Sequence, residues 1–198
     1  MFCESPDLAA ETSAGLEAGV CASSQNGSRR VNRVPFLIVP LDSTHERSGF
    51  NSNVSALDNY FRQQVSQDVR RNVAACFVAL DDKESVAGYY TLASSSVLLN
   101  ELPPAVAKKL PRYPSVPAVR MGRLAVDQAY KGQGLGAALL ADALMRAVRA
   151  EIAAYALLVD AKDVTAAAFY RHHGFIALPE APLTLFLPLA SAAKMMRS

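Results

Sequence analysis

The sequence lacks tryptophan, long apolar runs and any large excess of one charge. No stretch approaches the roughly 18 consecutive apolar residues of a membrane span. The amino terminus has no early Lys or Arg and no continuous apolar segment, so a secretory signal is not expected. Three scattered cysteines, Cys3, Cys21 and Cys76, suit neither a disulfide framework nor a Cys-rich zinc site. These features indicate reduced thiols and a cytoplasmic protein.

An apolar majority and an uneven distribution of charge are what the sequence does contain. Hydrophobic residues make up 51% of the chain, which is enough for a sizeable core. Residues 1–28 hold four acidic residues and no basic one, which gives them a charge of −4. The rest of the chain carries +6, and the net charge is +2. Such a basic body is compatible with an anionic ligand or nucleic acid but does not require one.

The composition divides the chain into three parts. Residues 1–33 are rich in Ala, Ser, Glu and Gly without a sustained period, and we expect a mobile leader there. A length of 198 residues fits one domain with extensions, which we place at residues 34–190. Residues 191–198 are expected to be a C-terminal tail.

Local patterns predict alternating strands and helices. Strands are expected over 36–40, 74–80, 86–99, 118–126, 155–159 and 183–189, with another return to strand at Phe175. Helices are expected over 55–72, 135–150 and 163–172, and a short one within the proline-rich segment 101–117. Ser55 is expected to cap the first helix, whose apolar stripe continues to Val73. The order predicts a mixed α/β domain.

A glycine-bearing loop carries the strongest chemical signal. Gly132, Gly134 and Gly136 lie between a strand ending at Val126 and a helix starting at Leu135. Backbone N–H groups of such a loop and helix start can cradle a pyrophosphate. A Walker loop is absent, and the spacing is not that of a dinucleotide fingerprint. On spacing alone, an ordinary strand-to-helix turn stays open as an alternative.

The loop Lys131-Gly-Gln-Gly-Leu-Gly136 resembles the acyl-coenzyme A loop of the GNAT acetyltransferase superfamily. A helix ending in Phe169-Tyr170, followed by Gly174-Phe175, resembles its second landmark. Lys131 replaces the usual Gln or Arg. The resemblance covers residues 34–189. It implies a central, mostly antiparallel mixed sheet of six to seven strands flanked by helices, with acetyl-CoA as co-substrate and no metal.

Shorter segments are similar to the TacT-like and AtaT-like GNAT toxins of bacterial type II toxin–antitoxin modules. They are Leu57-Asp58-Asn59-Tyr60-Phe61, Gly88-Tyr89-Tyr90-Thr91-Leu92, Gly122-Arg123-Leu124-Ala125-Val126-Asp127 and Leu183-Thr184-Leu185. This resemblance implies a toxin that acetylates the α-amine of aminoacyl-tRNA and blocks translation. It also implies a ribbon-helix-helix antitoxin and a homodimer. The Cys-Gly that usually precedes the first helix is absent here.

The resemblance also assigns the cofactor contacts. In the superfamily a β-bulge on the strand before the loop frees backbone groups, and the matching stretch here is Leu124, Ala125 and Val126. The Val126 N–H is expected to donate to the thioester oxygen, an oxyanion-type contact. The remaining cofactor-binding residues are expected to be Lys131, Gly132, Gln133, Gly134, Leu135, Gly136, Ala137 and Phe169.

Tyr170 is the candidate general acid. A phenol with a pKa of about 10 is protonated at neutral pH and can give its proton to a thiolate of pKa about 8.5. Position alone favours a packing role, and the Phe-Tyr resemblance reverses that preference in favour of catalysis. No carboxylate is an obvious general base, Asp127 included. An α-amine, with a pKa of about 7.7–8.0, needs less help than a lysine ε-amine at about 10.4.

Basic residues that could contact tRNA are Arg70, Arg71, Lys108, Lys109 and Arg120, with Arg112 and Arg123 also available. Tyr89 and Tyr90 could stack on a terminal base. A solvated helix face and core packing are the alternative interpretations. His45, His172 and His173 lack metal-ligand spacing. Two rival functions are a GNAT enzyme acting on a small-molecule or protein amine, and a non-catalytic acyl-CoA binder.

Overall fold

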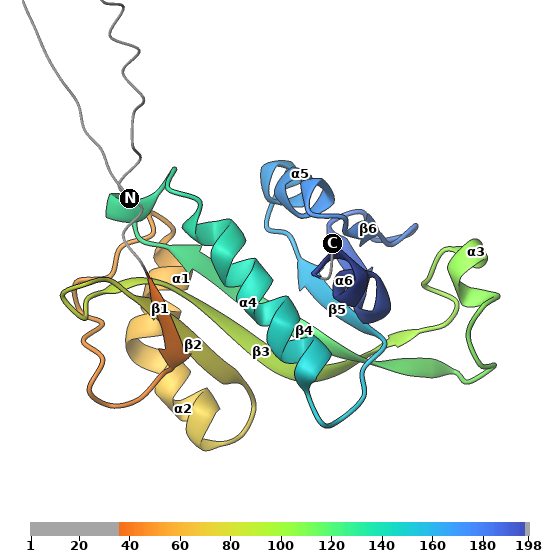
Figure 1. Cartoon of the computed structure of the whole chain (residues 1–198), viewed down its shortest axis with the longest axis horizontal. Coiled ribbons are helices and arrows are strands. Elements are labelled where there is room, and N and C mark those ends of the chain that lie inside the picture. The colour runs from red at the N-terminus through yellow and green to blue at the C-terminus, as the bar shows by residue number, and fades with distance from the viewer. Residues whose placement is uncertain (1–35, 197–198) are drawn as a thin grey trace, which may run out of the picture. The chain divides into compact units, whose positions relative to one another are not determined.

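The structure is a computed structural model that describes residues 36–196, built on one seven-stranded sheet (Figure 1). The strands are β1 (Leu37–Pro40), β2 (Ala75–Leu80), β3 (Val86–Leu98), β4 (Ser115–Val126), β5 (Ala156–Asp160), β6 (Ile176–Ala177) and β7 (Thr184–Pro188). They lie in the order β1-β2-β3-β4-β5-β7-β6, and of the neighbouring pairs β4–β5 is parallel. The predicted fold class is confirmed. The leader expected at residues 1–33 lies outside the described residues.

Helices cover both faces of the sheet. They are α1 (Ser55–Asn59), the π-helical turn η1 (Tyr60–Gln64), α2 (Val65–Arg70), α3 (Pro104–Ala107), the 3-10 turn η2 (Gln128–Tyr130), α4 (Leu135–Arg149), α5 (Val164–His172) and α6 (Leu189–Met195). Helix α6 forms where a tail was expected, because Leu189 and Ala192 are buried in the α4 cluster. Two predictions are wrong: Ser55 does not cap α1, and Val73 is 58% exposed beyond the end of α2.

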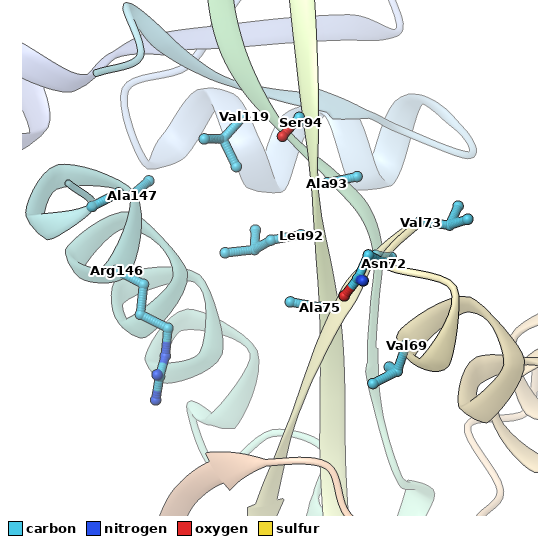
Figure 2. A pocket seen from close by; sticks show the side chains of 12 residues that line it. Val69, Asn72, Val73, Ala75, Leu92, Ala93, Ser94, Val119, Arg146 and Ala147 are labelled. Atoms are coloured by element: carbon cyan, nitrogen blue, oxygen red, sulfur yellow. The ribbon is translucent and has the colours of Figure 1, made fainter. Parts of the chain in front are cut away.

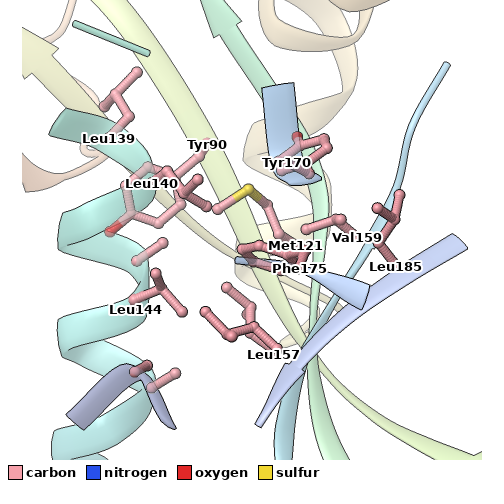
Figure 3. Packing of buried hydrophobic residues seen from close by; sticks show 14 of the residues in the cluster. Tyr90, Met121, Leu139, Leu140, Leu144, Leu157, Val159, Tyr170, Phe175 and Leu185 are labelled. Atoms are coloured by element: carbon pink, nitrogen blue, oxygen red, sulfur yellow. The ribbon is translucent and has the colours of Figure 1, made fainter. Parts of the chain in front are cut away.

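Strand alternation separates two apolar clusters on opposite faces of the sheet. Tyr89 packs with Phe50 and Phe61 beneath α1 and α2. Tyr90 belongs to the cluster that α4 covers, with Met121 and the helix leucines (Figure 3). Both tyrosines are 0% exposed, so the expectation that they stack on a base is wrong. A strand covered on both faces buries adjacent residues alike.

The register of the β3–β4 pairing shifts by one residue at Gly122. Thr91 of β3 pairs with Arg123 and Leu92 pairs with Met121, which leaves Gly122 as an extra residue in β4. The resulting bulge inverts the alternation of side chains. Met121 faces the α4 cluster before the bulge, whereas Ala125 belongs to the α1–α2 cluster after it.

Pairing between β4 and β5 ends one residue before the bulge, at Met121 and Val159. The chain then leaves β5 for α5, where Asp163 accepts a hydrogen bond from the Ala166 N–H at 2.8 Å as the helix cap. Residues 122–126 of β4 therefore have no strand on their β5 side. The sheet opens into a V at this point.

A cavity of about 420 Å³ lies between the ends of α2 and α4, over the middle of β3 (Figure 2). Its walls are mostly apolar, and its cation Arg146 is already paired with Asp142 at 2.7 Å. None of the predicted cofactor-binding or catalytic residues lines it. Several of these predicted residues lie instead around the opening of the sheet.

A substitution at Gly88 tests how closely α4 packs on β3. A Cβ at this position would lie 2.9 Å from both the Ala125 carbonyl oxygen and Leu139 Cδ1. We expect Gly88→Ala to lower the free energy of unfolding by about 1–3 kcal/mol, because backbone and core must move apart. Urea denaturation of both variants measures this, with Gly49→Ala as the control, since no atom lies within 4 Å there. Equal stability of the two variants would contradict the packing described.

Candidate functional site

A cavity of about 600 Å³ occupies the opening between β4 and β5. Four structural elements line it: the start of α1 (Val54, Ala56, Leu57), the bulged part of β4 (Met121, Gly122, Arg123, Leu124), Gly136 of α4, and the β5–α5 region (Asp160, Ala161, Lys162, Asp163, Thr165, Ala166, Phe169, Tyr170). Of the residues predicted from sequence, the cavity brings together Leu124, Gly136, Phe169 and Tyr170. Segments far apart in the chain thus share one site.

The free edge of β4 presents backbone groups to this opening. The Asp127 N–H donates to the Ala87 carbonyl at 2.9 Å, on the β3 side. Because successive residues of a strand point their N–H groups to opposite sides, the Val126 and Leu124 N–H groups point away from β3. The Ala125 N–H points toward β3. The expectation that the bulge lies at residues 124–126 is wrong, because it lies at Gly122. The outward N–H groups of Leu124 and Val126 are unpaired because β5 does not extend beside them.

The glycine loop has the geometry of an open turn. Gly132 and Gly134 adopt φ values of +77° and +81°, in the left-handed region, and a Cβ on either would meet no atom within 4 Å. Gly134 is the N-cap of α4, so the first N–H groups of that helix have no intrahelical partner. A Cβ at Gly136 would lie 3.9 Å from both Phe169 and Val126. These N–H groups and the open glycines are where an anionic group fits.

Three other loop residues predicted as cofactor ligands are placed differently. The Leu135 side chain is 2% exposed in the α4 core, so it offers only backbone atoms. The Gln133 side chain folds back and donates to the Ala129 carbonyl at 3.1 Å. Ala137 is half-buried one residue further along α4. The loop therefore presents mainly main-chain donors.

Lys131 ties the loop to the segment before α1. Its Nζ donates to the Ser52 carbonyl at 2.7 Å. Ser52 is buried and donates through its own N–H and hydroxyl to Asp58 at 2.9 and 2.6 Å. Asp127 adds a second link, accepting from the Asn51 N–H at 2.7 Å and the Ala129 N–H at 2.9 Å. Both of its oxygens are engaged, so Asp127 is a structural carboxylate here.

Tyr170 combines burial with a free hydroxyl. Its side chain is 8% exposed, and its ring packs against Phe169 and Phe175. Within residues 36–196 no protein group hydrogen-bonds the hydroxyl, and Figure 3 shows its oxygen pointing away from Met121 and Phe175. Burial, reinforced by the negative charge of Asp160, raises the pKa of Tyr170 to about 12. The phenol therefore keeps its proton throughout the physiological range.

The basic residues predicted to contact nucleic acid do not converge. Arg70 and Arg71 lie at the end of α2, and Lys108 and Lys109 directly follow α3, at the far end of the β3–β4 hairpin (Figure 1). Arg120 is close to the opening but forms an ion pair with Asp160. Sequence reasoning gave Arg123 no special weight, yet it lines the cavity. Its sequence signals were its place in the toxin-like segment 122–127 and its charge, which did not distinguish it from the other basic residues.

Across the part of the chain that the structure describes, no three His, Cys, Asp or Glu residues gather where a metal ion could be held. No helix in that part is both long and apolar enough to span a bilayer. Cys76 is a buried free thiol, as predicted, and burial raises its pKa to about 12.

Comparison with known proteins gives the family. The model of the acetyltransferase (GNAT) domain matches residues 72–177. The probable toxin TacT of Sinorhizobium fredii is 30% identical over 171 residues, covering 81% of this chain and 94% of that protein. The tRNA-acetylating toxin of Mycobacterium tuberculosis is 38% identical over 147 residues, covering 73% of this chain and 87% of its own length.

Solved structures agree. AtaT complexed with acetyl-methionyl-tRNAfMet superimposes with a TM-score of 0.76 at 30% identity, over 83% of this chain and 100% of that one. AtaTR bound with AcCoA has a TM-score of 0.72 at 29% identity, over 81% and 98%. An AtaT mutant bound to the C-terminus of the antitoxin AtaR has a TM-score of 0.70 at 26% identity, over 82% and 99%. The chain belongs to the GNAT acetyltransferase family, among its TacT-like and AtaT-like toxins.

Proposed function

We propose that this protein is an acetyl-CoA-dependent N-acetyltransferase toxin that acetylates the α-amine of aminoacyl-tRNA. One observation carries the proposal: Tyr170, a buried phenol whose hydroxyl has no protein partner within residues 36–196, shares a cavity with the unpaired edge of β4, between the glycine loop and α1. A relative is named a tRNA-acetylating toxin, and AtaT has been solved with an acetylated initiator tRNA. Acetylation of the amine removes the nucleophile of peptide-bond formation, so translation stops.

The chain's own groups fit an acyl-CoA. The open glycines 132 and 134 and the first N–H groups of α4 suit its diphosphate. The N–H and C=O groups of Leu124 and Val126 that point away from β3 suit a pantetheine amide, which pairs like a strand. The Val126 N–H is the donor for the thioester oxygen, where negative charge develops. The bound thioester supplies the activated acetyl group.

Tyr170 completes the transfer as the general acid. The neutral amine of the acceptor forms a bond to the acetyl carbon as the carbon–sulfur bond breaks, and the nitrogen, now positively charged, releases one proton to water. Tyr170 gives its proton to the departing sulfur, and solvent returns a proton to the phenolate. Burial assists both halves, since it keeps the phenol protonated and disfavours a lasting phenolate. Asp127 is engaged by two N–H groups, so deprotonation of the acceptor is left to its own pKa of about 7.7–8.0.

Partners follow from the proposed activity. A mutant of the toxin AtaT has been solved bound to the C-terminus of the antitoxin AtaR. We propose a ribbon-helix-helix antitoxin and a homodimer for this protein as well, and we place it in the cytoplasm, where charged tRNA is found. Residues 34–190 are the proposed catalytic domain.

Removal of the Tyr170 hydroxyl tests the acid. We expect Tyr170→Phe to lower kcat on charged tRNA by roughly 10²- to 10⁴-fold, because the thiolate must leave unprotonated. Acetyl-CoA affinity should be unchanged, since the ring stays. The wild-type rate should rise with the deprotonation of the amine and show no decline near pH 10, because the pKa of Tyr170 is about 12. Transfer of radiolabel from acetyl-CoA to charged tRNA measures both kcat and its dependence on pH.

Tyr155→Phe is the matched control, because Tyr155 is half-buried and lies outside the cavity. It should keep full activity. If Tyr170→Phe also kept it, Tyr170 would not be the acid. If the wild type labelled a lysine side chain or a small amine but no charged tRNA, the acceptor assignment would be wrong.

Gly136 tests the cofactor position. A valine side chain here would project toward Phe169 and Val126, into the cavity. We expect Gly136→Val to weaken acetyl-CoA binding at least about tenfold while leaving the melting temperature no lower, because valine disfavours a helix less than glycine does. Titration calorimetry measures the affinity, and Ala138→Val, on the exposed face of α4, should bind normally. Normal binding by Gly136→Val would place the cofactor elsewhere.

A further inference from the structure

Arg123 is the arginine that β4 directs into the cavity on the α1 side. The bulge at Gly122 inverts the alternation, so Arg123 shares the face of Ala125 rather than that of Met121. Its partner across the β3–β4 ladder, Thr91, is 1% exposed. The α4 helix, which begins at the glycine loop, covers the opposite face. The guanidinium therefore approaches the site from the side opposite α4.

The guanidinium is held in place by Tyr60. Its central carbon lies 3.3 Å from the centre of the Tyr60 ring, a close cation–π stack. The ring is itself fixed, since Tyr60 is 3% exposed and its hydroxyl donates to Asp68 at 2.9 Å. Tyr60 opens the π-helical turn η1, a feature often found at functional sites. Stacking occupies one face of the guanidinium plane and leaves its in-plane N–H donors available.

These donors have no acidic partner in the described part of the chain. Two other arginines near the sheet are neutralised, Arg120 by Asp160 and Arg146 by Asp142. The Arg123 side chain forms neither an ion pair nor a hydrogen bond with any of residues 36–196, although the residue is half-buried. A fixed, partly desolvated cation with free donors is arranged to receive an anion from outside the protein.

The chemistry of the acceptor identifies the anion. The planar fork of arginine binds phosphate or carboxylate with two parallel hydrogen bonds. An aminoacyl ester has no free carboxylate, so the nearest anion to its amine is the 5′-phosphate of the terminal nucleotide. The phosphates of acetyl-CoA are assigned to the glycine loop, at the start of the helix on the other face. An anion on the α1 side therefore arrives with the acceptor.

We propose that Arg123, stacked on Tyr60, forms an anion subsite that binds the phosphate of the nucleotide carrying the aminoacyl group. The subsite selects nucleotide-linked amines over free ones and orients the amine toward the acetyl group. This inference rests on the proposed function. Arg123 is a substrate-binding residue and takes no part in proton transfer.

Two small acceptors test the subsite: a 3′-O-aminoacyl-adenosine and its 5′-phosphate, with bulk aminoacyl-tRNA as reference. For the wild type we expect the 5′-phosphate to raise kcat/KM by roughly 10- to 100-fold, the usual effect of a charge-assisted contact. In Arg123→Gln the two small acceptors should agree within about twofold, because the 5′-phosphate has lost its partner. Acetyl-CoA affinity and melting temperature should be unchanged.

Arg149→Gln removes the same charge from the exposed end of α4 and should retain the full phosphate effect. Arg123→Lys keeps the charge without the planar fork and should show a reduced effect, so it serves if Arg123→Gln does not fold. No phosphate effect in the wild type, or its retention in Arg123→Gln, would overturn the subsite. Loss of acetyl-CoA affinity would assign the phosphate to the cofactor instead, which also overturns it. Failure of the wild type to acetylate any aminoacyl acceptor would instead refute the proposed function.

Discussion

The separation of β4 from β5 after the Met121–Val159 pair is the constraint on which the site depends. A parallel ladder continued beyond this pair would use the backbone groups of residues 122–126 within the sheet. The ladder ends because β5 itself ends at Asp160, from which the chain turns into α5. Unpaired strand groups are costly when buried and therefore favour a ligand that pairs with them. The same turn brings Tyr170 to the opening.

The bulge at Gly122 gives this opening two different sides. If Gly122 took a regular place in the ladder instead of forming the bulge, Arg123 would share the face of Met121 and of the α4 cluster, and its guanidinium would not lie on the α1 side of the cavity. With it, the main-chain donors of the glycine loop lie at the start of α4, and the guanidinium stacked on Tyr60 lies on the opposite face. A transferase of this kind must bring two substrates together without exchanging their positions. The two proposed anion sites, on opposite faces of one strand, would provide that distinction.

Local sequence patterns were sufficient for most of the fold and part of the site. Strand runs, the helix from Leu135 and the glycine loop follow from short-range periodicity, and Tyr170 was found through its neighbours Phe169 and Gly174. The bulge was misplaced because register depends on the partner strand. Tyr89 and Tyr90 were misjudged because a run of apolar residues does not show that both faces of a strand are covered. The importance of Arg123 depends on Tyr60, more than 60 positions away in the sequence, and no local pattern records such a stack.

The departure of Lys131 from the usual Gln or Arg has a physical explanation in this chain. Its ammonium group reaches the Ser52 carbonyl at 2.7 Å, and buried Asp58 holds Ser52 from the other side. Asp127 joins the same two segments through the Asn51 N–H. These hydrogen bonds join the loop proposed to hold the acyl carrier to the segment before α1, the helix proposed to face the acceptor. A shift of one segment must strain these bonds or move the other, so the relative placement of the two substrates is set by the protein rather than by their encounter.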